Sequence, residues 1–104
     1  MKKELYGKEK IIIEETSEEK LLEYYLVIKE TPFKSSNINY VSYGAEINMS
    51  DNNSDDVESK LLEDLFFSKE KAVTFMDSLV KGRVTPCELE EIAEDTLKQQ
   101  LMNL

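Results

Sequence analysis

The spacing of apolar residues divides the chain into a first part that predicts strands and a last part that predicts helices. The clearest alternation of apolar or small residues with polar ones runs from Val41 to Met49. Gly44 lies within this alternation, where a glycine indicates a bulge or the close approach of another backbone. A second alternation runs from Leu21 to Thr31, and the β-branched run Ile11–Ile13 predicts a strand from about Lys8 to Glu15.

The segment Val57–Phe67 fits either spacing. Its leucines can be placed at helical intervals behind Asp55 or Asp56 as an N-cap, whereas Leu62–Phe67 also fits a short strand. A strand here would complete a four-stranded meander with one apolar face. We therefore favour the strand and keep the helix as the alternative.

The last third of the chain predicts two amphipathic helices. Thr85 is a suitable N-cap for the second helix, Pro86 suits its first position, and Glu88 is spaced to complete a capping box. The apolar stripe of this helix consists of Leu89, Ile92, Ala93, Leu97 and Leu101. Such a stripe requires a surface on which to pack.

The first of these helices is expected to begin after the N-cap Ser68. It is expected to end at Gly82, because a glycine readily takes the left-handed conformation that ends many helices. Together the elements predict an α+β fold. A four-stranded antiparallel meander (β-β-β-β) over residues 1–67 is followed by a C-terminal helical hairpin (α-α) over residues 68–104, which packs on one face of the sheet. With 104 residues, the chain suits a single domain, 1–104.

The composition limits the cellular compartments and the classes of partner that we expect for this chain. Hydrophobic residues make up 40% and charged residues 34% of the chain, a balance typical of a soluble folded domain. No apolar run approaches the roughly 20 residues that span a bilayer, and no apolar signal-peptide core follows Met1. We therefore expect a cytoplasmic protein without a membrane partner. The net charge of −9 would repel a phosphate backbone, so direct nucleic-acid binding is not expected either.

The chain has no histidine and a single cysteine, Cys87. This composition excludes an internal disulfide, a multi-cysteine zinc site and a hydrolase triad that depends on imidazole. Cys87 follows the predicted helix start, which favours a thiolate, but Glu88 and Glu90 oppose that effect. A structural role for the cysteine is the simpler interpretation.

The segment Asp51–Asp56 resembles the first half of a calcium loop. Its sixth position is Asp56 instead of glycine, however, and its twelfth is Leu62 instead of glutamate. We interpret the segment as a solvated loop. In sum, no catalytic, cofactor-binding or metal-binding residue is expected.

Three stretches carry a resemblance to a known family. They are Tyr43–Ile47, Asp64–Val73 and Val84–Asp95, in that order after the predicted strands. In this respect the chain resembles a small family of uncharacterised clostridial proteins, described as a domain of unknown function. The resemblance would cover nearly the whole chain. It implies a bacterial cytoplasmic protein of about this length and supplies no activity.

The absence of catalytic groups favours a small protein-binding or regulatory module, which contacts a protein partner or a second copy of itself. Tyrosines anchor interfaces well, and Tyr24, Tyr25, Tyr40 and Tyr43 also fit strands as cross-strand pairs. A sheet covered on one side would leave Tyr25 and Val27 on an open face. The candidate partner-binding residues are Tyr25, Val27, Glu90, Glu91 and Glu94.

Two alternatives stay open. One is a homodimeric accessory protein of transcription or sporulation control, which would act on a DNA-binding protein. The other is an enzyme that uses strand carboxylates, for which the available residues are Glu14, Glu23, Glu46 and Glu63. No spacing in the sequence pairs these acids.

Overall fold

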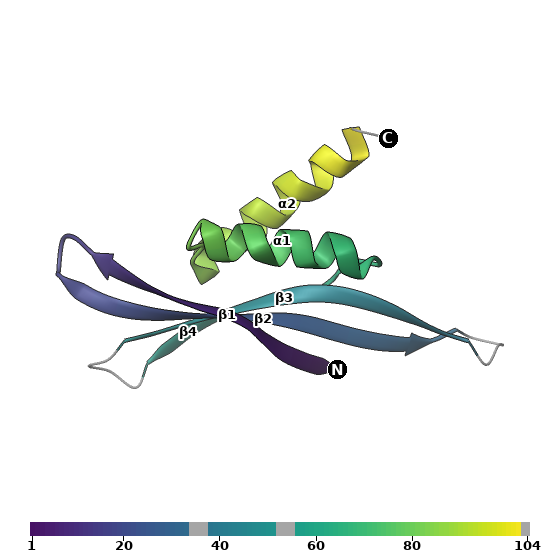
Figure 1. Cartoon of the computed structure of the whole chain (residues 1–104), viewed down its shortest axis with the longest axis horizontal. Coiled ribbons are helices and arrows are strands. Elements are labelled where there is room, and N and C mark those ends of the chain that lie inside the picture. The colour runs from purple at the N-terminus through teal and green to yellow at the C-terminus, as the bar shows by residue number, and fades with distance from the viewer. Residues whose placement is uncertain (34–37, 52–55, 103–104) are drawn as a thin grey trace.

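The computed structural model describes residues 1–33, 38–51 and 56–102. It shows four antiparallel strands in the order β1-β2-β3-β4, followed by two helices on one face of the sheet (Figure 1). The elements are β1 (Lys2–Ile13), β2 (Glu18–Pro32), β3 (Asn39–Asp51), β4 (Val57–Phe66), α1 (Lys69–Lys81) and α2 (Pro86–Met102). The predicted α+β fold is confirmed, and the helical alternative for Val57–Phe67 is wrong. β1 begins six residues before the predicted Lys8, because its first residues pair with β2 as far as Ile28.

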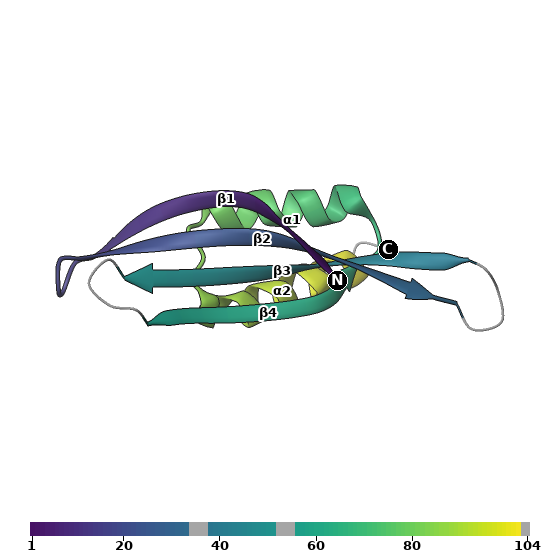
Figure 2. The ribbon, with the colours of Figure 1, turned by 90° about the horizontal axis from the view of Figure 1, so that it is seen from below.

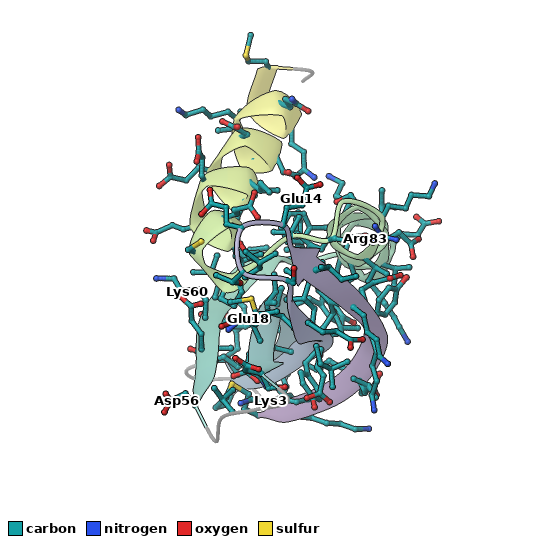
Figure 3. All side chains as sticks on the ribbon, turned by 90° about the vertical axis from the view of Figure 1, so that its left-hand side faces the viewer. Lys3, Glu14, Glu18, Asp56, Lys60 and Arg83 are labelled. Carbon is teal, nitrogen blue, oxygen red and sulfur yellow. The ribbon has the colours of Figure 1, made fainter. Side chains whose placement is uncertain are left out.

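Alternate residues of the two central strands form the floor of the core. Leu22, Tyr24 and Leu26 of β2 are buried, as are Ala45 and Ile47 of β3. The helices add a buried stripe of Ala72, Phe75, Met76, Leu79, Leu89 and Ala93. α1 lies along the side of β1 and β2 and α2 along the side of β3 and β4 (Figure 2). Each helix thus packs mainly on the sheet, as Figure 3 shows in a view along the strands.

The turn between the helices differs from the sequence prediction at one residue. Gly82 has a right-handed backbone (φ −82°), and Arg83 is the left-handed residue (φ 49°). The N–H of Arg83 donates to Val80 O at 3.1 Å, and that of Val84 donates to Leu79 O at 3.1 Å. This is the Schellman pattern with Arg83 just beyond the helix end, so the left-handed position falls one residue later than predicted.

The start of α2 is close to the prediction. The Thr85 N–H donates to Glu88 Oε1 at 3.1 Å, which is one half of the capping box. The Thr85 hydroxyl donates to the same carboxylate at 2.7 Å instead of accepting from a backbone N–H. At α1, the Ser68 hydroxyl accepts from the Lys71 N–H at 3.4 Å, as expected for an N-cap.

Gly44 lies beneath an irregular stretch of β4. Tyr43 pairs with Phe66 and Ala45 pairs with Leu62, so β4 inserts extra residues between these two pairs. A side-chain carbon added to Gly44 would lie 2.0 Å from the Leu62 carbonyl oxygen. The predicted bulge and close backbone approach are both confirmed.

Tyr24 connects the sheet to the turn between the helices. Its side chain is fully buried, and its hydroxyl donates to the Val84 carbonyl oxygen at 2.9 Å. Burial first, and then the charges of Glu9 and Glu88, raise the pKa of Tyr24 from 10.0 to about 12. The hydroxyl therefore stays protonated in the fold at pH values where the unfolded chain would lose the proton.

This shift predicts an alkaline loss of stability. The contribution of Tyr24 is complete below pH 10, and it falls by roughly 2 to 3 kcal/mol as the pH rises to 12, because the unfolded state releases its proton first. Tyr24→Phe should cost about 1 to 3 kcal/mol at pH 7, since the Val84 carbonyl loses its donor. Urea unfolding of both proteins at several pH values measures the difference. An equal alkaline loss in the two proteins would contradict this role of Tyr24.

Candidate partner-binding surface

The two central strands extend beyond the rest of the molecule as a two-stranded arm. Pairing of β1 with β2 ends at Ile28, and pairing of β4 with β3 ends at Tyr43. Residues 29–32 of β2 and 39–42 of β3 continue to pair with each other, and we call these residues the arm. The arm projects past the ends of both helices (Figure 1). It contributes to the 54 Å length of the molecule.

Three aromatic side chains lie in a row along the arm. Phe33 follows the last arm residue of β2, Tyr40 lies within the arm, and Phe67 follows β4 at the base of the arm. Phe33 packs edge-on against Tyr40 with ring centroids 5.7 Å apart, and Tyr40 packs against Phe67 at 6.1 Å. Their exposed fractions are 57%, 39% and 71%, respectively. We call these three residues the aromatic patch. Ile38 and Val41 of the same hairpin are also exposed, so apolar surface is concentrated here.

Backbone and polar contacts hold the arm in place. The Phe33 N–H donates to Ile38 O at 2.9 Å, and the Asn39 amide donates to Glu30 at 2.9 Å. Lys29 donates to Asp64 in the irregular part of β4 at 3.2 Å. These bonds fix the geometry of the hairpin but bury little apolar area. A two-stranded hairpin without an apolar covering layer is only marginally stable in water, so the aromatic patch is suited to being covered by another molecule.

The predicted open apolar face is wrong at Val27. Val27 is only 1% exposed, and Ser42 on the neighbouring strand is fully buried. The inserted residues of β4 approach this side of the sheet, where Asp64 accepts from the Ser42 hydroxyl. This hydrogen bond, and then the one from Lys29, lower the pKa of Asp64. Val27 is therefore buried, and the structure leaves it almost no surface for a partner.

Tyr25 shares that face and is half-buried. Its hydroxyl donates to Glu23 at 3.3 Å, and burial and then the charge of Glu23 raise the pKa of Tyr25. Beside it, Lys3 and Glu46 form an ion pair at 2.9 Å across three strands. The face away from the helices is thus largely polar around Tyr25.

The other predicted partner-binding residues are exposed on α2. Glu90, Glu91 and Glu94 all point to solvent, and Glu90 pairs with Lys60 of β4 at 3.3 Å. Figure 3 shows Lys60 at the edge of the sheet beneath α2. These acids lie on a different element from the aromatic patch, so they can influence the approach of a partner without forming the contact at the arm.

The four carboxylates considered for an enzyme do not form one cluster. Glu23 and Glu46 lie on the same face beside Tyr25, whereas Glu63 pairs with Lys29 at 3.8 Å. Glu14 lies in the turn after β1. Each of the first three already has a hydrogen-bonding or ionic partner, and the four acids do not converge on a shared site.

The structure adds no evidence for chemistry at Cys87 or for a calcium site at Asp51–Asp56. Cys87 is exposed, with its sulfur 3.3 Å from the Thr85 hydroxyl. The possible calcium loop Asp51–Asp56 lies largely outside the described residues, although Asp51 accepts from Lys20 at 3.3 Å. Among residues 1–33, 38–51 and 56–102, no three acidic or cysteine side chains gather as a metal site would require. Within the same part of the chain, neither helix has the length and apolarity needed to cross a bilayer.

Sequence reasoning considered Tyr40 but missed Phe33 and Phe67. Phe33 and Tyr40 are only seven positions apart, and β2 pairs with β3 up to Pro32 and Asn39, so a strand-pairing prediction with an exact register would have brought them together. Phe67 lies 27 positions after Tyr40, and it reaches the patch only because β4 pairs with β3 up to Phe66.

Comparison with known proteins identifies a relationship but no activity. A family model described as "Family of unknown function (DUF6514)" matches residues 2–99. No curated protein and no solved structure matches the chain.

Proposed function

Because the chain belongs to this family of unknown function, its role has to be inferred from its own surface, and we propose that it is a non-catalytic protein-binding module. Its partner docks on the aromatic patch of the arm. The observation that carries this proposal is the exposure of a row of three rings, in which Tyr40 packs against Phe33 and against Phe67, with Phe33 and Phe67 more than half exposed.

Aromatic side chains are the residues that most often supply the binding energy of protein interfaces. Tyr40 already packs against each of the other two rings, which reduces the side-chain freedom that is lost when a partner covers them. The ion pair of Lys29 with Asp64 lies beside the rings and can form part of the polar rim. The aromatic patch therefore combines an apolar centre with an ion pair at its edge.

The partner is expected to be another protein with a basic surface, in the bacterial cytoplasm that the family resemblance implies. The net charge of −9 makes two copies of this chain repel each other at long range. The same charge attracts a basic protein. A second copy is the competing occupant, and its signature is a mass that rises with concentration.

Capture from native cytoplasm tests the proposal with matched variants. Phe33→Ser removes one ring of the patch, and Ile12→Ser removes an apolar side chain of comparable exposure at the other end of the sheet (57% against 69%). We expect a protein that is retained by the wild type and by Ile12→Ser but binds about 30-fold more weakly to Phe33→Ser, as for the loss of an interface hot spot. If no captured protein distinguishes the two variants, the aromatic patch is not the docking site.

The acids on α2 should control how fast this partner associates. Reversing Glu90, Glu91 and Glu94 to lysine is expected to lower the association rate about tenfold or more at low salt, with little change in dissociation. Folding should be nearly unaffected, because all three side chains are exposed. Stopped-flow association at several salt concentrations measures the effect. An association rate that responds to neither salt nor charge reversal would show that these acids serve solubility alone.

A further inference from the structure

We infer that the protein partner adds an extended segment as a new strand beside β3, along residues 39–42 of the arm. The inference rests on the proposed function and specifies how the partner is held at the aromatic patch. Figure 2 shows β3 continuing past the end of β4 in this region. Pairing of β3 with β4 ends at Tyr43, so residues 39–42 have a strand beside them only on the β2 side. We call the other side of these four residues the open edge.

The backbone groups of Asn39 and Val41 point to the open edge. The Phe33 N–H donates to Ile38 O at 2.9 Å, which makes these two residues a hydrogen-bonded pair. Along an antiparallel ladder, such pairs alternate with pairs that exchange no hydrogen bond. The register of β2 and β3 places Asn39 and Val41 in pairs of the second kind. Their N–H and C=O groups are therefore directed away from β2.

The neighbouring residues agree with this alternation. Pro32 has no N–H, and it lies opposite Asn39, where the ladder needs none. Tyr43 directs its backbone to the same side as Val41 and pairs there with Phe66 of β4. Within the described parts of β4 and α1, no residue takes the corresponding place beside Val41. An added strand would supply these missing hydrogen bonds, whereas a helix would not, because it uses its own backbone groups internally.

The open edge lacks the features that hinder strand addition along the other edges of the sheet. Edge strands are commonly kept from pairing by charged side chains and by proline. β1 and β4, the outer strands of the sheet, carry charged residues at short intervals. On the other edge of the arm, β2 contributes Lys29, Glu30 and Pro32. The open edge has neither a charge nor a proline, since it consists of Asn39, Tyr40, Val41 and Ser42.

The side chains at the open edge set the chemistry of the added segment. Tyr40 and Val41 point to opposite faces of the arm and are 39% and 36% exposed. The Tyr40 ring contacts Phe67, which directly follows β4 and so lies at the start of the line that an added strand would occupy. A segment with successive β-branched or aromatic residues would cover Tyr40 on one face and Val41 on the other.

A segment of another protein fits the open edge better than a second copy does. Two copies that paired through their open edges would share only these four residues, because β4 occupies the side of β3 from Tyr43 onward. This short pairing would have to hold together two chains that each have a net charge of −9. An extended segment of a basic protein is attracted by the same charge.

Amide hydrogen exchange, followed by NMR, tests the inference at single residues. In the free chain, we expect the amides of Asn39 and Val41 to be protected at least about tenfold less than those of Tyr40 and Ser42, which bond to β2. The probe is then a short peptide of the captured protein, chosen from an overlapping set for its binding to the full chain. We expect this peptide to slow exchange at Val41 at least about tenfold and to leave Glu30, opposite Val41, unchanged.

Two proline variants separate strand addition from contact with the rings. Val41→Pro removes an N–H at the open edge, and Glu30→Pro removes the N–H opposite it, on the other edge of the arm. We expect Val41→Pro to bind the peptide about tenfold more weakly, and Glu30→Pro to bind within about twofold of the wild type. Val41→Thr keeps the N–H and the side-chain shape, so it should also bind within about twofold. The exchange measurement needs no substitution and decides the question even if a proline unfolds the arm.

The outcomes distinguish the open edge from the aromatic patch. If Phe33→Ser weakens binding but exchange at Val41 does not respond, the partner covers the rings without adding a strand, and the inference is overturned. It is also overturned if no short peptide of the captured protein binds, because the partner then presents a folded surface. If neither Phe33→Ser nor Val41→Pro weakens binding, the proposed function fails as well. Self-association that Val41→Pro abolishes would assign the open edge to a second copy instead.

Discussion

Gly44→Ala is expected to prevent folding or to lower the free energy of unfolding by more than about 4 kcal/mol. The added methyl would lie 2.0 Å from the Leu62 carbonyl oxygen and 2.9 Å from the Glu63 Cα. Both contacts are with backbone, so no side chain can turn away to relieve them, and β4 would have to leave β3 at this point. Circular dichroism and urea unfolding measure the loss.

Gly82→Ala provides the matched control. Gly82 has an ordinary right-handed backbone, and its added methyl would lie 3.2 Å from the Ser78 carbonyl oxygen. We expect its stability to change by less than about 1 kcal/mol. A Gly44→Ala protein that folds with a loss as small as this would show that β4 does not cross over Gly44 as described.

Replacing the leucines of α2 by alanine should lower the free energy of unfolding by less and less toward the C-terminal end of the helix. Leu89→Ala removes a fully buried side chain and should cost about 2 to 5 kcal/mol. Leu97→Ala should cost about 1 to 2 kcal/mol because Leu97 is only partly buried, and Leu101→Ala should cost less than about 0.5 kcal/mol. Equilibrium urea unfolding of the three variants measures the gradient. An equal loss at Leu89 and Leu101 would mean that the whole stripe packs in the free protein.

The features predicted correctly from the sequence are those set by local spacing and local chemistry. The alternation in Val41–Met49, the N-cap at Ser68 and the proline at the start of α2 all depend on neighbours within a few residues. Gly44 was also informative, because a glycine in the middle of a strand has few explanations other than a bulge or a backbone contact.

The features missed depend on tertiary geometry. The stripe from Leu89 to Leu101 has one spacing throughout, so periodicity gives no sign that α2 leaves the sheet halfway. Val27 alternates with its neighbours as a residue on the outer face should, yet it is buried, and local spacing gives no sign of this. The usual preference for glycine predicts the left-handed residue at Gly82, whereas the hydrogen bonds of the turn place it at Arg83.

Photocrosslinking from the arm tests the central claim most directly. A benzophenone-bearing phenylalanine analogue at Tyr40 keeps an aromatic ring within the patch, and the same analogue at Ile12 serves as the control at the other end of the sheet. After irradiation in native cells, we predict a defined protein adduct from position 40 that is absent from position 12 and is lost when Phe33→Ser is added. Adducts that are the same from both positions, or none from position 40, would contradict a partner-binding function for the aromatic patch.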